Sequence, residues 1–75
     1  MDFKKTIEFQ MYADVWSFHK RFYQVDNSEM YWDQVVEESR KLSKKYRSEF
    51  VNNLLAAVLT ELERKGKKAS ENAAQ

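Results

Sequence analysis

Residues 11–23 read M-Y-A-D-V-W-S-F-H-K-R-F-Y, and the spacing of apolar residues in this stretch decides the fold. Wound at about 100° per residue, the stretch places its large side chains on one half of a helical cylinder. These side chains are Met11, Tyr12, Val15, Trp16, Phe18, His19, Phe22 and Tyr23. Because a face so rich in aromatic groups is unfavourable in water, other helices are expected to cover it.

The composition of the chain favours a small helical domain. The chain has 75 residues with one glycine and no proline, whereas turn-rich β folds need both. A chain of this length forms one domain with a small core. It has no cysteine, which excludes disulfides and thiolate metal sites and favours a reducing compartment.

Charge and hydropathy narrow the possible partners. The net charge of +1 gives no general attraction to nucleic acid or anionic lipid. Mean hydropathy is −0.81, and no apolar run approaches the roughly 20 residues that span a bilayer. Residues 1–10 lack the apolar core of a signal peptide. We therefore expect a cytoplasmic protein without a membrane partner.

Two further apolar periods complete the prediction of an all-α three-helix bundle. The helices are expected over about residues 9–23, 27–45 and 49–65, in a single domain over residues 1–66. The apolar arc of the second helix holds Tyr31, Trp32, Val35, Val36, Leu42 and Tyr46. The third helix is expected to bury Phe50, Val51, Leu54, Leu55, Val58, Leu59 and Leu62.

Capping residues set the expected starts of the first two helices. Residues 1–7 predict a short extended arm, after which the first helix begins near Phe9 with Thr6 as a candidate cap. Asp26 is the expected N-cap of the second helix, and Glu29, three residues later, completes a capping box.

The remaining boundaries follow from similar local signals. Val25 and Met30 occupy the positions of a hydrophobic staple around the start of the second helix. Ser48 is the expected N-cap of the third helix after a tight break, and the alternative is one kinked helix that runs through this point. Gly66 fits the residue that follows a helix end, so residues 67–75 are predicted to form a frayed or flexible polar tail.

Side chains that could carry catalysis or bind a metal are sparse. His19 is the only histidine, and a lone histidine on an apolar face is usually a packed side chain with a satisfied nitrogen. Asp33 and Glu37 lie four residues apart on the most charged side of their helix. Solvated carboxylates on such a side lack the burial or close partner that acid–base catalysis needs. We expect no enzyme activity, no cofactor and no metal.

Basic runs are the alternative functional candidates. One run could line a phosphate backbone from the end of the second helix. Its members are Arg40, Lys41, Lys44, Lys45 and Arg47. A second run covers residues 64–68, but an up-down-up bundle places the two runs at opposite poles. Because either run could contact phosphates, binding of nucleic acid as a small accessory protein is the alternative function.

The widths of the apolar arcs favour a protein partner. The arcs on the first and third helices span about 180°, wider than the ≳ 100° stripe that a helix packs on its own core. Uncovered apolar surface of this kind marks partner sites, and a two-fold homodimer is the commonest arrangement. The expected contact residues are Phe9, Tyr12, Trp16, Tyr23, Leu55, Leu59 and Leu62.

Several segments carry a resemblance to other proteins. They read W-S-F-H-K-R-F-Y, Y-W-D-Q-V-V-E-E-S, K-K-Y and F-V-N-N-L-L-A-A-V-L-T-E-L-E-R-K. Over about residues 11–65 the chain resembles small uncharacterised proteins of bacteriophages, prophages and plasmids of Gram-positive bacteria. The resemblance implies an accessory protein that acts in the bacterial cytoplasm on a host or phage protein, and it carries over no functional residues.

Overall fold

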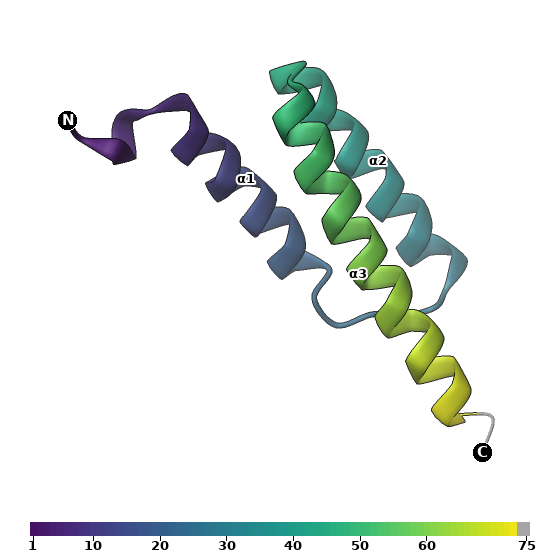
Figure 1. Cartoon of the computed structure of the whole chain (residues 1–75). Coiled ribbons are helices and arrows are strands. Elements are labelled where there is room, and N and C mark those ends of the chain that lie inside the picture. Colours follow the sequence, from purple (N-terminus) through teal and green to yellow (C-terminus); the bar gives the residue numbers. More distant parts are fainter. Residues whose placement is uncertain (74–75) are drawn as a thin grey trace.

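The computed structural model describes the backbone of residues 1–73 and the side chains of residues 1–69. A 3₁₀ turn, η1 (Phe3–Lys5), precedes three helices, α1 (Ile7–Arg21), α2 (Glu29–Tyr46) and α3 (Glu49–Ala73). The described residues contain no strand. In the view of Figure 1, α1 and α3 run downward and α2 runs upward, so that α1 and α3 are roughly parallel and α2 is antiparallel to both. The predicted all-α three-helix bundle is confirmed.

A small apolar core lies where the three helices meet. Each helix contributes side chains that are less than 9% exposed. These are Val15, Phe18, Phe22, Val35, Val51, Leu55 and Leu62. The core extends through edge-to-face aromatic contacts, since the Phe22 ring lies 5.2 Å from Phe18 and 5.6 Å from Tyr31. The Tyr31 hydroxyl also donates a hydrogen bond of 2.7 Å to the Phe22 carbonyl, which ties the end of α1 to the start of α2.

The first helix begins earlier than the sequence predicts. Thr6 is the N-cap of α1, because its side chain accepts a hydrogen bond from the Phe9 amide. Glu8 lies in the first turn, where a carboxylate complements the helix dipole. Residues 1–7 do not form the predicted extended arm. Asp2 instead caps η1, and Thr6 ends it by donating from its backbone amide to the Phe3 carbonyl.

The N-cap of α2 is Ser28, and the predicted capping box at Asp26 and Glu29 is wrong. The Ser28 hydroxyl accepts a hydrogen bond from the Tyr31 amide, while the Asp26 carboxylate accepts from the Ser28 amide and hydroxyl. This two-residue shift also removes the predicted staple, because Met30 is 71% exposed. Asp26 therefore holds the capping residue and does not cap the helix itself.

A sharp reversal separates α2 from α3, so the alternative of one kinked helix is wrong. Arg47 ends α2 in the left-handed region, with φ 47° and ψ 47°. Its amide donates a hydrogen bond of 2.8 Å to the Ser43 carbonyl. The Ser48 hydroxyl then accepts from the Val51 amide at 3.4 Å, as predicted for the N-cap of the third helix.

Gly66 does not end the third helix. It has no positive φ and is buried inside α3, which continues to Ala73, so the predicted end near residue 65 is wrong. Residues 67–73 of the predicted tail are helical, and residues 74–75 lie outside the described residues. The missing side chain of Gly66 leaves room for the loop between α1 and α2. From this loop, the Asn27 side-chain amide donates a 2.9 Å hydrogen bond to the Gly66 carbonyl.

Candidate functional site

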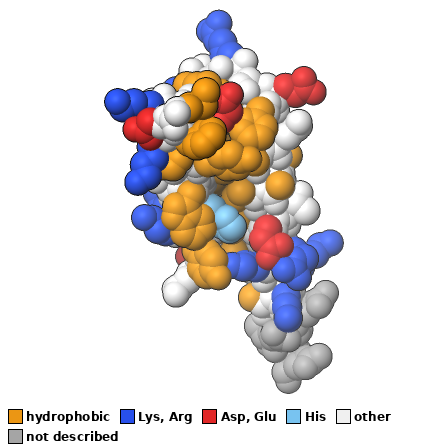
Figure 2. All heavy atoms as spheres, turned by 60° about the vertical axis from the view of Figure 1, so that its left-hand side comes forward, with side chains coloured by type: hydrophobic (Ala, Val, Ile, Leu, Met, Phe, Trp, Pro, Cys, Tyr) orange, Lys and Arg blue, Asp and Glu red, His pale blue; other side chains and the backbone are white. Residues whose placement is uncertain are grey.

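Four large aromatic side chains form an exposed stripe along α1. Phe9 is 45% exposed, Tyr12 55%, Trp16 54% and Tyr23, just after the helix, 52%. Their spacing of three, four and seven residues keeps them within about 60° of one another around the helix axis. Figure 2 shows hydrophobic side chains gathered on this side of the molecule. We call these four residues the aromatic stripe.

The stripe is exposed because the opposite side of α1 is anchored to the bundle. Val15 and Phe18 face the core, and two ion pairs tie α1 to α2. The Lys45 ammonium lies 2.8 Å from the Asp14 carboxylate, and the Arg21 guanidinium lies 3.5 Å from Glu38. These contacts fix which side of α1 faces the bundle, so that the stripe points outward.

The third helix supports the stripe from its flank. The Tyr12 and Phe50 rings meet edge to face, with centroids 5.3 Å apart. The Lys65 ammonium lies 3.5 Å from the centroid of the Tyr23 ring and donates a hydrogen bond of 3.4 Å to the Tyr23 carbonyl. A cation above an aromatic face fixes the ring while leaving its other face free. Two of the four aromatic rings are thus oriented by α3.

His19 lies within the stripe and is partly buried. Its ring is 5.8 Å from both the Trp16 and the Tyr23 rings. His19 is thus packed as predicted, but among the described residues its buried Nε2 atom has no hydrogen-bond partner, so the predicted satisfied nitrogen is not this one. Among the described residues no group of three or more His, Cys, Asp or Glu side chains could hold a metal ion.

The leucines of α3 do not belong to the exposed surface. Leu55 is 4% exposed and Leu62 is fully buried, so their predicted role as contact residues is wrong. Leu59 is half-buried and packs against the core, beside a shallow groove between α2 and α3. The apolar arc of α3 is wide because this helix packs against both other helices. Most of the apolar arc on α3 is therefore used for packing inside the bundle.

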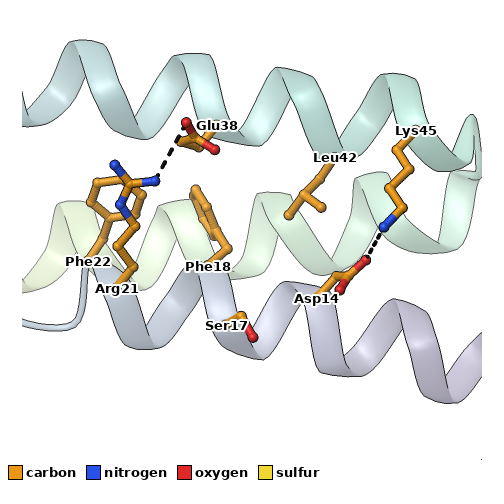
Figure 3. Close-up of a pocket in the computed structure, with 8 residues that line it drawn as sticks. All are labelled: Asp14, Ser17, Phe18, Arg21, Phe22, Glu38, Leu42 and Lys45. Carbon is orange, nitrogen blue, oxygen red and sulfur yellow. Dashed lines mark hydrogen bonds and ion pairs between the residues drawn. The ribbon is translucent and has the colours of Figure 1, made fainter.

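A groove between α1 and α2 collects polar groups that the sequence analysis did not connect. It has a volume of about 280 Å³, with Phe18, Phe22 and Leu42 among its lining residues (Figure 3). Besides its ion pair with Lys45, the Asp14 carboxylate accepts a 2.5 Å hydrogen bond from the Tyr46 hydroxyl. Hydrogen bonds from Lys45 and Tyr46 hold the pKa of Asp14 below its usual 3.8.

The groups in this groove stabilise the fold and are poorly placed for proton transfer. A carboxylate whose pKa is lowered is a weak base at neutral pH. The paired charges also leave no excess charge for a ligand. Local sequence could not reveal the cluster, because Asp14 lies 31 residues from Lys45. Such pairs are formed only when the helices pack.

The basic run near the end of α2 is partly neutralised. Lys41 pairs with Glu38 at 3.2 Å and with Glu37 at 3.9 Å, and Lys45 pairs with Asp14. In the part of the chain whose side chains are described, Arg40, Lys44 and Arg47 are in no ion pair.

The second basic run lies apart from the first, whereas the paired carboxylates of α2 lie beside it. In residues 64–68, Arg64 pairs with Glu61 at 2.6 Å, and this segment lies at the opposite end of the bundle from the end of α2 (Figure 1). Asp33 and Glu37 border the same exposed surface of α2 as Arg40 and Lys44. The structure thus gathers no single basic patch from the two runs.

Helix lengths and comparisons add two further findings. Within the described residues, no helix has the length and apolar character that crossing a membrane requires. No protein-family model matches the chain, and no curated protein and no solved structure matches it significantly. The resemblance to small phage and plasmid proteins stays a prediction.

Proposed function

We propose that this chain is a non-enzymatic interaction module that binds a protein surface through the aromatic stripe. The observation that carries the proposal is the exposure of four large aromatic side chains, each close to half exposed, on one side of one helix. Four such side chains present on the order of 400 Å² of aromatic surface to water. Contiguous apolar patches of this size on small soluble domains mark interaction sites.

The chemistry and the rigidity of the stripe suit binding. Trp and Tyr are enriched at the centres of protein interfaces, where they supply large contact area at a low entropic cost. The rings of Tyr12 and Tyr23 are already held by Phe50 and Lys65. Preorganised side chains lose less freedom on binding, which favours affinity. Trp16, between them, is the expected hot spot.

A nucleic-acid-binding role is the second candidate. It depends on Arg40, Lys44 and Arg47, whose charges are exposed at the end of α2. These three charges, with two neighbouring lysines already paired to carboxylates, make a short footprint compared with the six to ten phosphate contacts of strong binders. The stripe offers a larger and more distinctive surface, so we rank protein binding first.

The proposal is tested by capture of proteins from a lysate of a Gram-positive bacterium on the immobilised chain. Proteins retained by the natural chain should be lost from the Trp16→Glu variant, because a carboxylate at the centre of the stripe cannot be buried against an apolar partner. Met30→Glu is the matched control, since Met30 is an exposed apolar residue on α2.

Circular dichroism of both variants is the control that checks whether they remain helical. A protein partner bound equally by all three chains would contradict the proposal. Retention of DNA or RNA that is lost in an Arg40→Gln, Lys44→Gln, Arg47→Gln variant, but unaffected by Trp16→Glu, would establish the second candidate instead.

A further inference from the structure

We infer that the partner of the aromatic stripe is a second copy of this chain, packed antiparallel about a two-fold axis near Trp16. The inference rests on the proposed function, because it assigns an occupant to the same surface. Three observations carry it: the excess of exposed area, the placement of the aromatic residues about Trp16, and the distribution of charge along α1 and α3.

The first observation is that the chain exposes more surface than a monomer of its size should. A compact monomer of 9.0 kDa has an accessible surface on the order of 4,900 Å². This chain has 5912 Å². Part of the difference lies on the last turns of α3, which extend beyond the other helices (Figure 1). The part that lies on the aromatic stripe, on the order of 400 Å², is about half of the 800 Å² or so that each partner buries in a standard interface, and side chains that flank the stripe would supply the rest.

The second observation is that the stripe has Trp16 near its middle. Phe9 and Tyr12 lie toward one end of α1, and Tyr23 lies at the other. Antiparallel pairing therefore brings Trp16 against its own copy and places Tyr23 opposite Phe9 of the second copy, since each lies seven residues from Trp16. A patch that is used twice in this way suits a closed dimer. The best packed contact also lies at the centre, where interface energy concentrates.

The third observation is the polarity of charge along the paired face. Because α1 and α3 are parallel, their first turns lie at one end of the face, with Glu8 and Glu49. Asp2, Lys4 and Lys5 in or beside η1 and Arg47 in the α2–α3 turn also lie at this end, where the three carboxylates are interspersed with bases. The opposite end carries the bases Lys20, Lys65 and Lys68 beside the Glu61–Arg64 pair.

This polarity selects the antiparallel arrangement over the parallel one. In the antiparallel dimer the basic end of each copy meets the end of the other copy that holds the carboxylates of Asp2, Glu8 and Glu49, and every favourable contact occurs twice. Parallel pairing would instead place Lys20, Lys65 and Lys68 opposite their own copies. Opposed like charges are unfavourable, and the parallel alignment of helix dipoles adds to the penalty. Lys20, which lies one turn beyond Trp16, also comes opposite Tyr12 of the second copy, where a cation–π contact is available.

Sedimentation equilibrium of the full chain, between ~5 and ~200 μM, tests the dimer. The natural chain should show the mass of two chains at the upper concentration, and so should Met30→Glu. Trp16→Glu should show the mass of one chain throughout. A natural chain that stays monomeric at the upper concentration overturns the inference, and so does a Trp16→Glu variant that still dimerises.

The orientation is tested with a nitroxide label at Lys67→Cys, a unique site because the chain has no cysteine. Position 67 lies about eleven residues beyond the level of Trp16 along α3, which is about 16 Å at 1.5 Å per residue. Pulsed electron resonance should therefore give about 35 Å between labels in an antiparallel dimer, against about 20 Å or less in a parallel one. The shorter distance contradicts the inference.

Failure of this inference can be separated from failure of the proposed function. A monomeric natural chain that still captures a protein through Trp16 rejects only the second copy as occupant. A monomeric chain that captures nothing in a Trp16-dependent way rejects both proposals. If the Trp16→Glu variant still dimerises, the aromatic stripe is not the dimer interface.

Discussion

Gly66 shows how one missing side chain can position a loop. A Cβ atom at this position would lie 2.7 Å from the Asn27 side-chain oxygen and 3.3 Å from the Trp32 ring. Both distances are tighter than ordinary van der Waals contact. The backbone conformation at Gly66 is one that any residue adopts, so close packing and not backbone freedom requires glycine here.

We predict that Gly66→Val lowers the free energy of unfolding by about 1–3 kcal/mol, the usual cost of overpacking. The Asn27 hydrogen bond to residue 66 should be lost at the same time, because valine displaces the amide. Lys67→Val is the control, since Lys67 is exposed on the next position of α3 and its replacement should cost at most about 0.5 kcal/mol. Urea unfolding followed by circular dichroism measures both. Equal losses in the two variants would refute the packing argument.

Asp14 is the residue whose ionisation couples most directly to helix packing. Its pKa is lowered in the folded chain, first by the hydrogen bond from Lys45 and then by that from Tyr46. The unfolded chain therefore binds a proton at a higher pH than the folded chain does. The stabilisation is present above about pH 4 and is lost as pH falls through the folded-state pKa.

We predict that the natural chain is more stable than Asp14→Asn at neutral pH and that this difference shrinks as pH falls from about 5 to about 2. Comparing the two chains cancels the contributions of other carboxylates to the pH dependence of stability. One of these is Glu61, whose pKa is also lowered, chiefly by its hydrogen bond from Arg64. Thermal unfolding of both chains across this pH range gives the difference. A difference that does not depend on pH would show that the Asp14 carboxylate stabilises the fold without its charge.

At the scale of elements, the reversal between α2 and α3 stores backbone strain in Arg47. Its left-handed conformation costs a residue with a Cβ atom about 1–2 kcal/mol, whereas glycine adopts it freely. The strain is offset by two local contacts, the Arg47 amide bond to Ser43 and the Ser48 cap. The Ser43 hydroxyl also donates a 2.7 Å hydrogen bond to the Asn52 side chain across the turn.

We predict that Arg47→Gly stabilises the chain by about 0.5 kcal/mol, because relief of strain exceeds the added entropy of the unfolded state. A domain of this size should then gain about 2–4 °C in Tm. Arg40→Gly is the matched control, since Arg40 is an exposed arginine within α2 and glycine there should cost about 1 kcal/mol. If both substitutions lower Tm by the same amount, relief of the left-handed conformation at position 47 does not stabilise the chain.

At the scale of the whole molecule, the structure separates residues that hold the fold from residues that are free to bind. Leu62 is fully buried on α3, whereas Trp16 is 54% exposed on α1. Both belong to wide apolar arcs. The difference arises because Leu62 lies in the core where the helices meet, while the stripe on α1 touches α3 only along one flank.

We predict that Leu62→Ala lowers the free energy of unfolding by about 2–5 kcal/mol, which is enough to unfold much of so small a domain. Trp16→Ala should cost less than about 1 kcal/mol in the monomer, and its main effect should be on association. Urea unfolding at low concentration, together with sedimentation at high concentration, separates the two effects. A Trp16→Ala monomer as unstable as Leu62→Ala would mean that the aromatic stripe belongs to the core.

Local sequence determined the number and type of helices, because apolar periods of 3.6 residues and a near absence of glycine and proline leave no other regular structure. The break before α3 was also readable, since the Ser48 cap acts within one turn. The aromatic residues of the stripe, Phe9, Tyr12, Trp16 and Tyr23, could likewise be chosen from their spacing on one face.

Only the tertiary structure decided which apolar edges stay exposed, because exposure depends on where neighbouring helices lie. Leu55 and Leu62 have the same helical spacing as the residues that remain exposed in the aromatic stripe, yet they are buried by helices distant in the chain. Gly66 had the local appearance of a helix end, but its place against Asn27 and Trp32 makes it a packing position. The Asp14–Lys45 pair joins residues 31 positions apart, and such contacts arise only when α1 and α2 meet.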